Sequence, residues 1–229
     1  MEELNYETED GSGLLGTCKK HPATDTTPGI SAESTQGLTT DLSDATGENT
    51  TQQKAVTYLK DCTAAQNNIM AKCIALVGSF RDAVHSEYED NEAMKKKFHI
   101  GSKIPTSVSG MKSELKYLSG TVGDYKDTLK KHGIKDEDFT NLDGFCEELD
   151  AADTEQENAK KLQKEATKAR DLAMKKLIRT KQSIRHDAKI IFKDQPLVLI
   201  EFEKMPPPPR GRKANPPAPP ASGGGTPSK

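Results

Sequence analysis

The apolar residues in the middle of the chain recur every three or four positions, which is the spacing of one face of an α-helix. A first series is interrupted only by Gln66. A second series is unbroken, and Gly133 followed by Ile134 suits the left-handed ending of a helix. The sequence therefore predicts two helices, one along Ala55, Leu59, Cys62, Ile69, Cys73, Leu76, Phe80 and Ala83, and one along Ile104, Val108, Met111, Leu115, Leu118, Val122, Tyr125 and Leu129.

A third apolar series begins after three acidic residues at 136–138, which suit the N-terminus of a helix. One helix over 137–193 would measure about 85 Å, much more than the other two. Asp150 and Asp153 are candidates for an N-cap. We therefore expect a break near 150–154, although one continuous helix is the alternative; the series comprises Leu142, Phe145, Leu149, Ala152, Ala159, Leu162, Ala166, Ala169, Ala173, Leu177, Ile184 and Ile191.

The connectors at about 98–106 and 132–136 are short, so successive helices must reverse direction and pack side by side. Pro196 suits the first turn of a further short helix that folds back over one end of the bundle. The predicted fold class is all-α: an antiparallel, coiled-coil-like bundle of three or four long helices, spanning 51–205.

Both ends of the chain differ from this middle part. Residues 1–50 contain ten acidic side chains and two lysines, with few apolar residues. Such a segment does not recover the entropy lost on ordering, so we expect an acidic disordered arm over 1–50. Residues 206–229 are rich in proline and glycine and carry only positive charges, which predicts a basic disordered tail.

Composition excludes several classes of protein. Only 33% of the residues are apolar, there is no tryptophan, and the longest apolar run, 197–200, is far below the roughly 20 residues of a membrane span. The N-terminus resembles no secretory signal, so we expect a cytoplasmic protein. The four cysteines form no Cys-x-x-Cys pair, which predicts free thiols and no zinc site.

The sequence contains no convincing catalytic or cofactor-binding arrangement. Asp82 and His85 form one Asp-x-x-His pair, but no second copy exists to complete a di-metal site. Cys62 and Cys73 share a helical face as expected of core residues, and no glycine-rich phosphate loop is present. We therefore expect a non-enzymatic protein without cofactor or metal.

The third apolar series carries an uneven distribution of charge. Residues 136–157 hold ten acidic side chains and no basic one, whereas 160–193 hold twelve basic and three acidic ones. The basic residues include a stripe on one face. Three interpretations remain open: a solvated face that suits the helix dipole, a binding surface for nucleic acid or an anionic membrane, or antiparallel pairing with the acidic half of a second copy. The stripe is Lys164, Lys168, Lys175 and Arg179, and His186 and Lys193 continue it.

The proline-rich tail resembles a ligand of SH3-type domains through Pro206 and Pro209. The match is imperfect, because Gly211 occupies the position of the expected base, with Arg210 and Arg212 on either side. A tail that only increases solubility is the alternative.

These observations favour a non-enzymatic helical scaffolding module that binds protein partners through its bundle surface or its proline-rich tail. The alternative function is binding to a polyanion through the basic stripe. The predicted partner-binding residues are Pro206, Pro209, Arg210, Arg212, Lys164, Lys168, Lys175 and Arg179.

Overall fold

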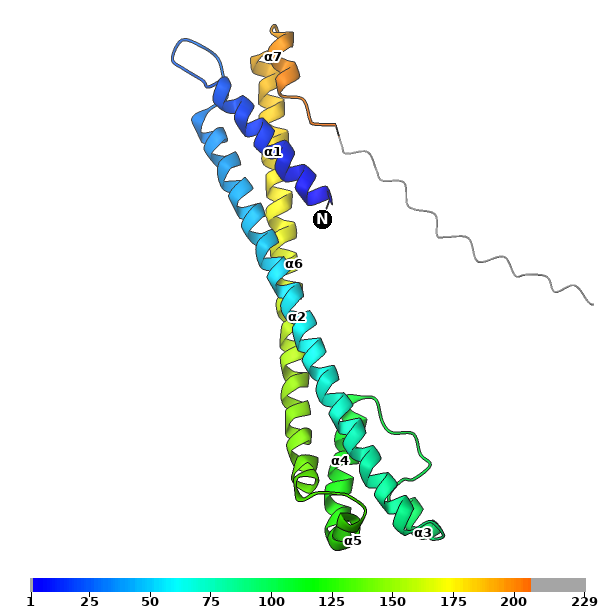
Figure 1. Ribbon diagram of the computed structural model, residues 1–229. Helices are drawn as coiled ribbons and strands as arrows, with labels where there is room; N and C mark the ends of the chain where they lie inside the picture. Colours follow the sequence, from blue (N-terminus) through cyan, green and yellow to red (C-terminus); the bar gives the residue numbers. More distant parts are fainter. Residues whose placement is uncertain (1, 207–229) are drawn as a thin grey trace, which may run out of the picture. The chain divides into compact units, whose positions relative to one another are not determined.

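The structure, a computed structural model, describes residues 2–206, with side chains from Asn5 onward (Figure 1). Over these residues the chain is helical and forms no strand, and an isolated bridge joins Pro22 to Ile30. The predicted all-α helical bundle is confirmed. Its elements are α1 (Glu2–Lys20), α2 (Ala32–Glu87), α3 (Glu92–Lys97), α4 (Val108–Val122), the 3-10 turn η1 (Gly123–Tyr125), α5 (Lys126–Lys131), α6 (Asp136–Ile191) and α7 (Pro196–Glu201).

The chain divides into two compact units. The first unit combines residues 1–42 with 178–229, and the second unit is the continuous segment 43–177. Both α2 and α6 contribute residues to each unit. The units are described separately below.

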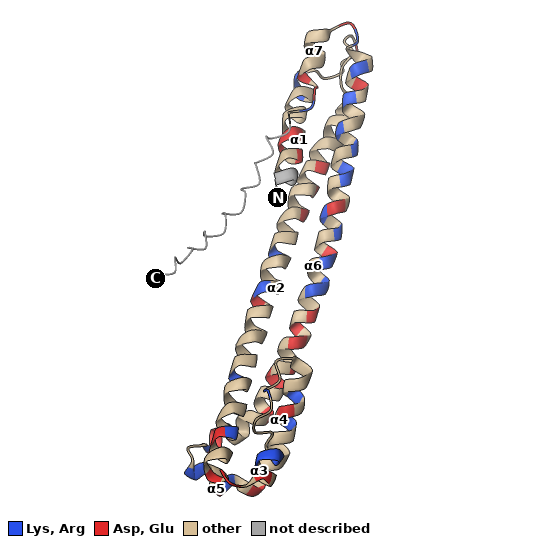
Figure 2. Cartoon of the chain, turned by 90° about the vertical axis from the view of Figure 1, so that its right-hand side faces the viewer, with Lys and Arg blue, Asp and Glu red and all other residues tan. Residues whose placement is uncertain are grey.

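The second unit contains the main apolar core. Its α4 lies beside α2 and α6 (Figures 1 and 2), and the side chains between them are fully buried. Phe80 of α2 packs edge-on against Phe139 of α6, with ring centroids 5.4 Å apart. The apolar series predicted from the sequence supply most of this core, which includes Cys73, Leu76, Phe80, Ala83, Met111, Leu115, Leu118, Val122, Leu129, Leu142 and Leu149.

Local signals explain several helix ends in the second unit. Ser107 caps α4 by accepting a hydrogen bond from the Gly110 amide. Gly133 has a φ of 93°, and the Ile134 amide donates to the Leu129 carbonyl at 3.3 Å while the Gly133 amide donates to the Lys130 carbonyl at 3.2 Å. This is the left-handed ending predicted from the sequence.

The predicted break near 150–154 is wrong, because α6 continues through it as one helix of 56 residues. The side chains of the two candidate cap residues instead contact neighbouring helices. Asp150 forms an ion pair with Lys112 of α4, and Asp153 accepts a hydrogen bond from Gln66 of α2 at 2.8 Å. Their carboxylates therefore hold neighbouring helices and are not available to cap a new helix start.

The N-terminal region also differs from the expected disordered arm over 1–50. Residues 2–20 form α1, and α2 begins at Ala32. In the first unit, Leu14, Ile30 and Leu38 are buried. These few apolar residues suffice because the acidic side chains beside them are neutralised by basic residues of α6, which composition alone does not reveal.

That neutralisation takes the form of a buried ion cluster in the first unit. Asp10 lies 3.0 Å from the Lys181 ammonium and 2.6 Å from the Arg185 guanidinium. Glu7 pairs with Lys181 and, at 3.3 Å, with Lys204. The side chains of Asp10 and Lys181 are only 1% and 2% exposed, so the cluster fixes α1 to α6 away from water.

The C-terminal part of the first unit agrees with the predicted short helix. α7 starts at Pro196, and Phe202 just after it is buried and stacks on Phe192 with centroids 5.5 Å apart. The predicted basic tail over 206–229 lies outside the described residues except for Pro206, which is exposed.

Candidate functional site

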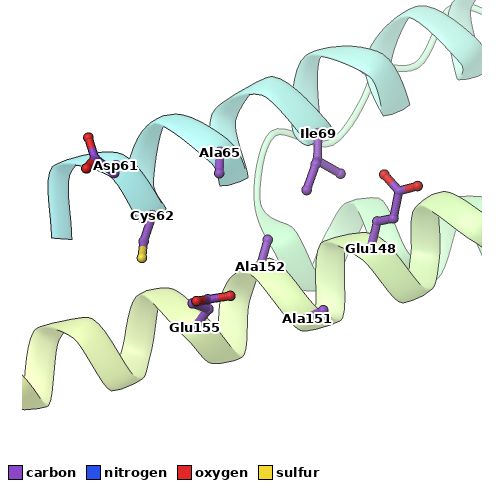
Figure 3. Close-up of a pocket in the computed structure, with 8 residues that line it drawn as sticks. All are labelled: Asp61, Cys62, Ala65, Ile69, Glu148, Ala151, Ala152 and Glu155. Atoms are coloured by element: carbon purple, nitrogen blue, oxygen red, sulfur yellow. The ribbon is translucent and has the colours of Figure 1, made fainter. Parts of the chain in front are cut away.

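The second unit has an open groove between α2 and α6. It encloses a volume of about 440 Å³. In Figure 3, Cys62, Ala65 and Ile69 of α2 point towards α6, and Ala152 of α6 points towards α2. The lining residues are Asp61, Cys62, Ala65 and Ile69 of α2 with Glu148, Ala151, Ala152 and Glu155 of α6.

The groove is hollow because its floor is built from small side chains. Ala65, Ala151 and Ala152 occupy positions where larger residues would fill the space between the two helices. In the neighbouring part of the core, Phe80, Leu142 and Leu149 fill the equivalent space and are fully buried. The groove therefore lies where the closely packed core ends.

Polar contacts between the helices fix the register beside the groove. The Tyr58 hydroxyl donates to Glu155 at 2.8 Å, and the Gln156 amide donates to the Thr63 hydroxyl at 3.2 Å. Together with the contact between Gln66 and Asp153, they place α2 and α6 antiparallel. Because these contacts are directional, they keep the two walls of the groove in one alignment.

The rim of the groove is acidic. Over residues 2–206, the carboxylates of Asp61, Glu148 and Glu155 form no ion pair. The hydrogen bond with Glu155 raises the pKa of Tyr58 to about 12, so the Tyr58 hydroxyl remains protonated at neutral pH. The arrangement offers a negative potential over an apolar floor.

Metal-ligating and thiol side chains bear on the chemistry of the groove, and Cys62 is one of its lining residues. In the described part of the chain no three metal-ligating side chains come together. All four cysteines are free and buried. Burial raises the pKa of both Cys18 and Cys73 to about 11, which keeps these two thiols protonated and weakly nucleophilic.

A second polar cluster of the second unit joins α2 to α4. Arg81 forms a buried ion pair with Glu114 at 2.7 Å and donates to the Ser102 carbonyl at 2.7 Å. His99, which has a φ of 51°, lies 2.9 Å from Glu114 and stacks on Tyr117. The two terminal guanidinium nitrogens of Arg81 and both carboxylate oxygens of Glu114 have partners within the cluster, whereas the buried Nε of Arg81 has no hydrogen-bond partner among the described residues. We interpret this cluster as an anchor for the 98–107 connection.

The basic stripe predicted from the sequence lies on α6 (Figure 2). Lys164, Lys168 and Lys175 are exposed in the second unit, and Arg179 is exposed in the first. Within residues 2–206 none of the four forms an ion pair. The structure thus places the stripe on one continuous helix, and these four residues do not line the groove between α2 and α6.

Of the partner-binding residues predicted in the tail, the structure describes only Pro206. Pro206 is exposed, while Pro209, Arg210 and Arg212 lie outside the described residues. The groove itself was not predicted, because it depends on the register between two helices distant in sequence. The available signal was the presence of the small residues Ala65, Ala151 and Ala152 on the two helices, of which only Ala152 belongs to a predicted apolar series.

No helix within residues 2–206 combines the length and the apolar character needed to cross a bilayer. No family model, curated protein or solved structure matches the chain.

Proposed function

We propose that the chain is a non-enzymatic interaction module and that the groove between α2 and α6 receives a helix of a protein partner. The observation that supports this proposal is the unfilled apolar floor lined by Cys62, Ala65, Ile69, Ala151 and Ala152. Helices commonly bind by placing an apolar face in such a groove. A third helix would cover the floor as α4 covers the neighbouring core.

The acidic rim specifies the chemistry of that helix. Three carboxylates without ion-pair partners in the described chain surround the floor, so a helix whose apolar residues are flanked by lysine or arginine fits best. We place this interaction in the cytoplasm, where four free cysteines remain reduced.

Photo-crosslinking in the host cell tests this function. A photoreactive phenylalanine analogue at Ala65, an exposed residue that lines the groove, should form a covalent adduct with the bound helix. The same analogue at Lys60, exposed but not lining the groove, is the matched control. Deletion of 207–229 should leave the adduct unchanged, whereas Ala151→Arg should abolish it through bulk and positive charge.

Adducts of equal yield at Ala65 and Lys60, or at neither position, would contradict a binding role for the groove. An adduct that disappears with the tail deletion would instead assign the interaction to the proline-rich segment predicted from the sequence.

A second candidate function is polyanion binding through the basic stripe. It is supported by the exposure of Lys164, Lys168, Lys175 and Arg179 and by the lack of ion pairs at these residues within 2–206. Four contacts with duplex DNA phosphates give a slope of about −3 to −4 when the logarithm of the binding constant is plotted against that of the salt concentration. Fluorescence anisotropy with a labelled duplex measures this slope. Replacing all four basic residues by glutamate should abolish binding. If the wild-type chain does not bind the duplex even at low salt, polyanion binding is eliminated as a function.

A further inference from the structure

We propose that the helix received by the groove is α6 of a second copy, so that the chain forms an antiparallel homodimer with Leu162 on its two-fold axis. This proposal rests on the proposed function and adds the identity of the partner. It is carried by a second periodic face of α6, by the position of the groove along that face, and by the distribution of charge.

The second periodic face lies outside the core of the second unit. Its residues follow one another in alternating steps of three and four, as in the contact face of a coiled coil. Unlike the core series, all of them except Ala169 are exposed. Leu162 and Leu172 are 51% and 66% exposed. The whole face consists of Glu148, Ala151, Glu155, Asn158, Leu162, Glu165, Ala169, Leu172 and Lys176.

The spacing along this face matches a two-fold axis at Leu162. Leu172 lies ten residues after Leu162, and Ala152 in the groove lies ten residues before it. At 1.5 Å per residue each separation is about 15 Å. When two copies of α6 cross antiparallel with Leu162 against Leu162, Leu172 of each copy reaches the groove of the other.

The charges agree with the same register. Glu148 and Lys176 both lie fourteen residues from Leu162 on opposite sides, so each Glu148 meets a Lys176 across the interface. Lys176 also lies 3.9 Å from Asp44 in its own chain, and an ammonium group has donors for both carboxylates. A parallel arrangement would place the acidic segments of the two copies together and is disfavoured.

A second copy also accounts for the exposed leucines. In an isologous contact, Leu162 packs against Leu162 of the second copy on the two-fold axis, and the contact of Leu172 with the groove occurs twice, once on each side of the axis. The α2–α6 pair of each copy would then supply the missing layer for the other, and the section around the groove would become a four-helix bundle.

Disulfide trapping tests the axis directly. In Leu162→Cys the two new thiols face each other, and mild oxidation of the purified full chain should convert most of it to a covalent dimer. Leu172→Cys is the register control, since its two thiols are about 30 Å apart in the proposed dimer. Lys164→Cys, exposed on another face of the same helix, should likewise remain uncrosslinked.

Sedimentation equilibrium provides the second measurement. Leu162→Glu and Leu172→Glu should each weaken dimerisation at least tenfold, and the exposed Leu197→Glu in α7 should not. Glu148→Lys should weaken the dimer and Glu148→Lys with Lys176→Glu should restore it. Circular dichroism should stay unchanged, because all the altered side chains are exposed in the single chain.

A chain that remains monomeric at 100 µM, or that is trapped equally well through Leu172→Cys and Leu162→Cys, would overturn the homodimer. The adduct at Ala65 separates this outcome from failure of the proposed function. An adduct with twice the mass of the chain supports both proposals, an adduct with another protein overturns only the homodimer, and the absence of any adduct contradicts both.

Discussion

Asp10→Ala should release α1 from the first unit and lower the free energy of unfolding of that unit by about 3–5 kcal/mol. Asp10 is the carboxylate shared by Lys181 and Arg185, and Lys181 is almost completely buried. Its removal leaves Glu7 as the remaining carboxylate beside the buried Lys181, the largely buried Arg185 and the more exposed Lys204. Breaking a buried ion pair in this way costs far more than the pair contributes at a surface.

Hydrogen exchange of the α1 amides measures this effect locally. Glu9→Ala is the matched control, because Glu9 is the adjacent acidic residue and is exposed. We expect α1 to lose its protection in Asp10→Ala and to keep it in Glu9→Ala. Equal protection of α1 in both variants would show that apolar burial of Leu14 and Cys18 is sufficient to hold the helix.

The same residue should make α1 sensitive to acid. Burial opposes ionisation of Asp10, but hydrogen bonds from the Met205 amide, Lys181 and Arg185 outweigh it, so the pKa of Asp10 lies below its ordinary value of 3.8. A carboxylate with a lowered pKa stabilises the fold above the unfolded-state value, and this contribution is lost as the pH falls through the folded-state value. Protection of α1 should therefore decrease with acidification in the wild type, and less so in Asp10→Ala.

Arg81→Met should destabilise the second unit by about 3–5 kcal/mol. The substitution leaves the buried Glu114 carboxylate with His99 as its remaining partner, and it removes the donor to the Ser102 carbonyl. The 98–107 connection, which includes the left-handed residue His99, loses its attachment to α2. Urea denaturation with linear extrapolation measures the change.

The double variant Arg81→Met with Glu114→Leu distinguishes an unpaired charge from lost packing. Replacing both members of a buried pair by apolar residues removes the desolvation cost, so the double variant should recover most of the stability lost in Arg81→Met. If the two effects simply add, packing of the Arg81 side chain, and not its charge, supports this part of the second unit.

The sequence predicted the core of the second unit well because its helices are defined by local periodicity. Phe80, Leu115 and Leu149 lie on the predicted apolar faces and are buried, and the ending at Gly133 follows from the residues immediately around it. These features depend on neighbours three or four positions away, so a linear pattern is sufficient to locate them.

The features that the sequence did not predict depend on contacts between residues far apart in the sequence. Composition assigns Asp10 to an acidic disordered arm, because its partners Lys181 and Arg185 lie 171 and 175 residues further along the chain. Asp153 was interpreted as a helix cap because its partner Gln66 is on another helix. The groove escaped prediction for the same reason, since its volume depends on how Ala65 aligns with Ala151 and Ala152.

The composition of the first unit, which joins residues 1–42 to residues from 178 onward, has a consequence for the order of events during synthesis. Ribosomes release the N-terminus first, yet the cations that pair with α1 emerge only after about three quarters of the chain has been made. The continuous segment 43–177 is complete before that point. Nascent α1 therefore lacks its basic partners while the second unit folds. Closure of the loop of 174 residues between Glu7 and Lys181 is a late, entropically costly step.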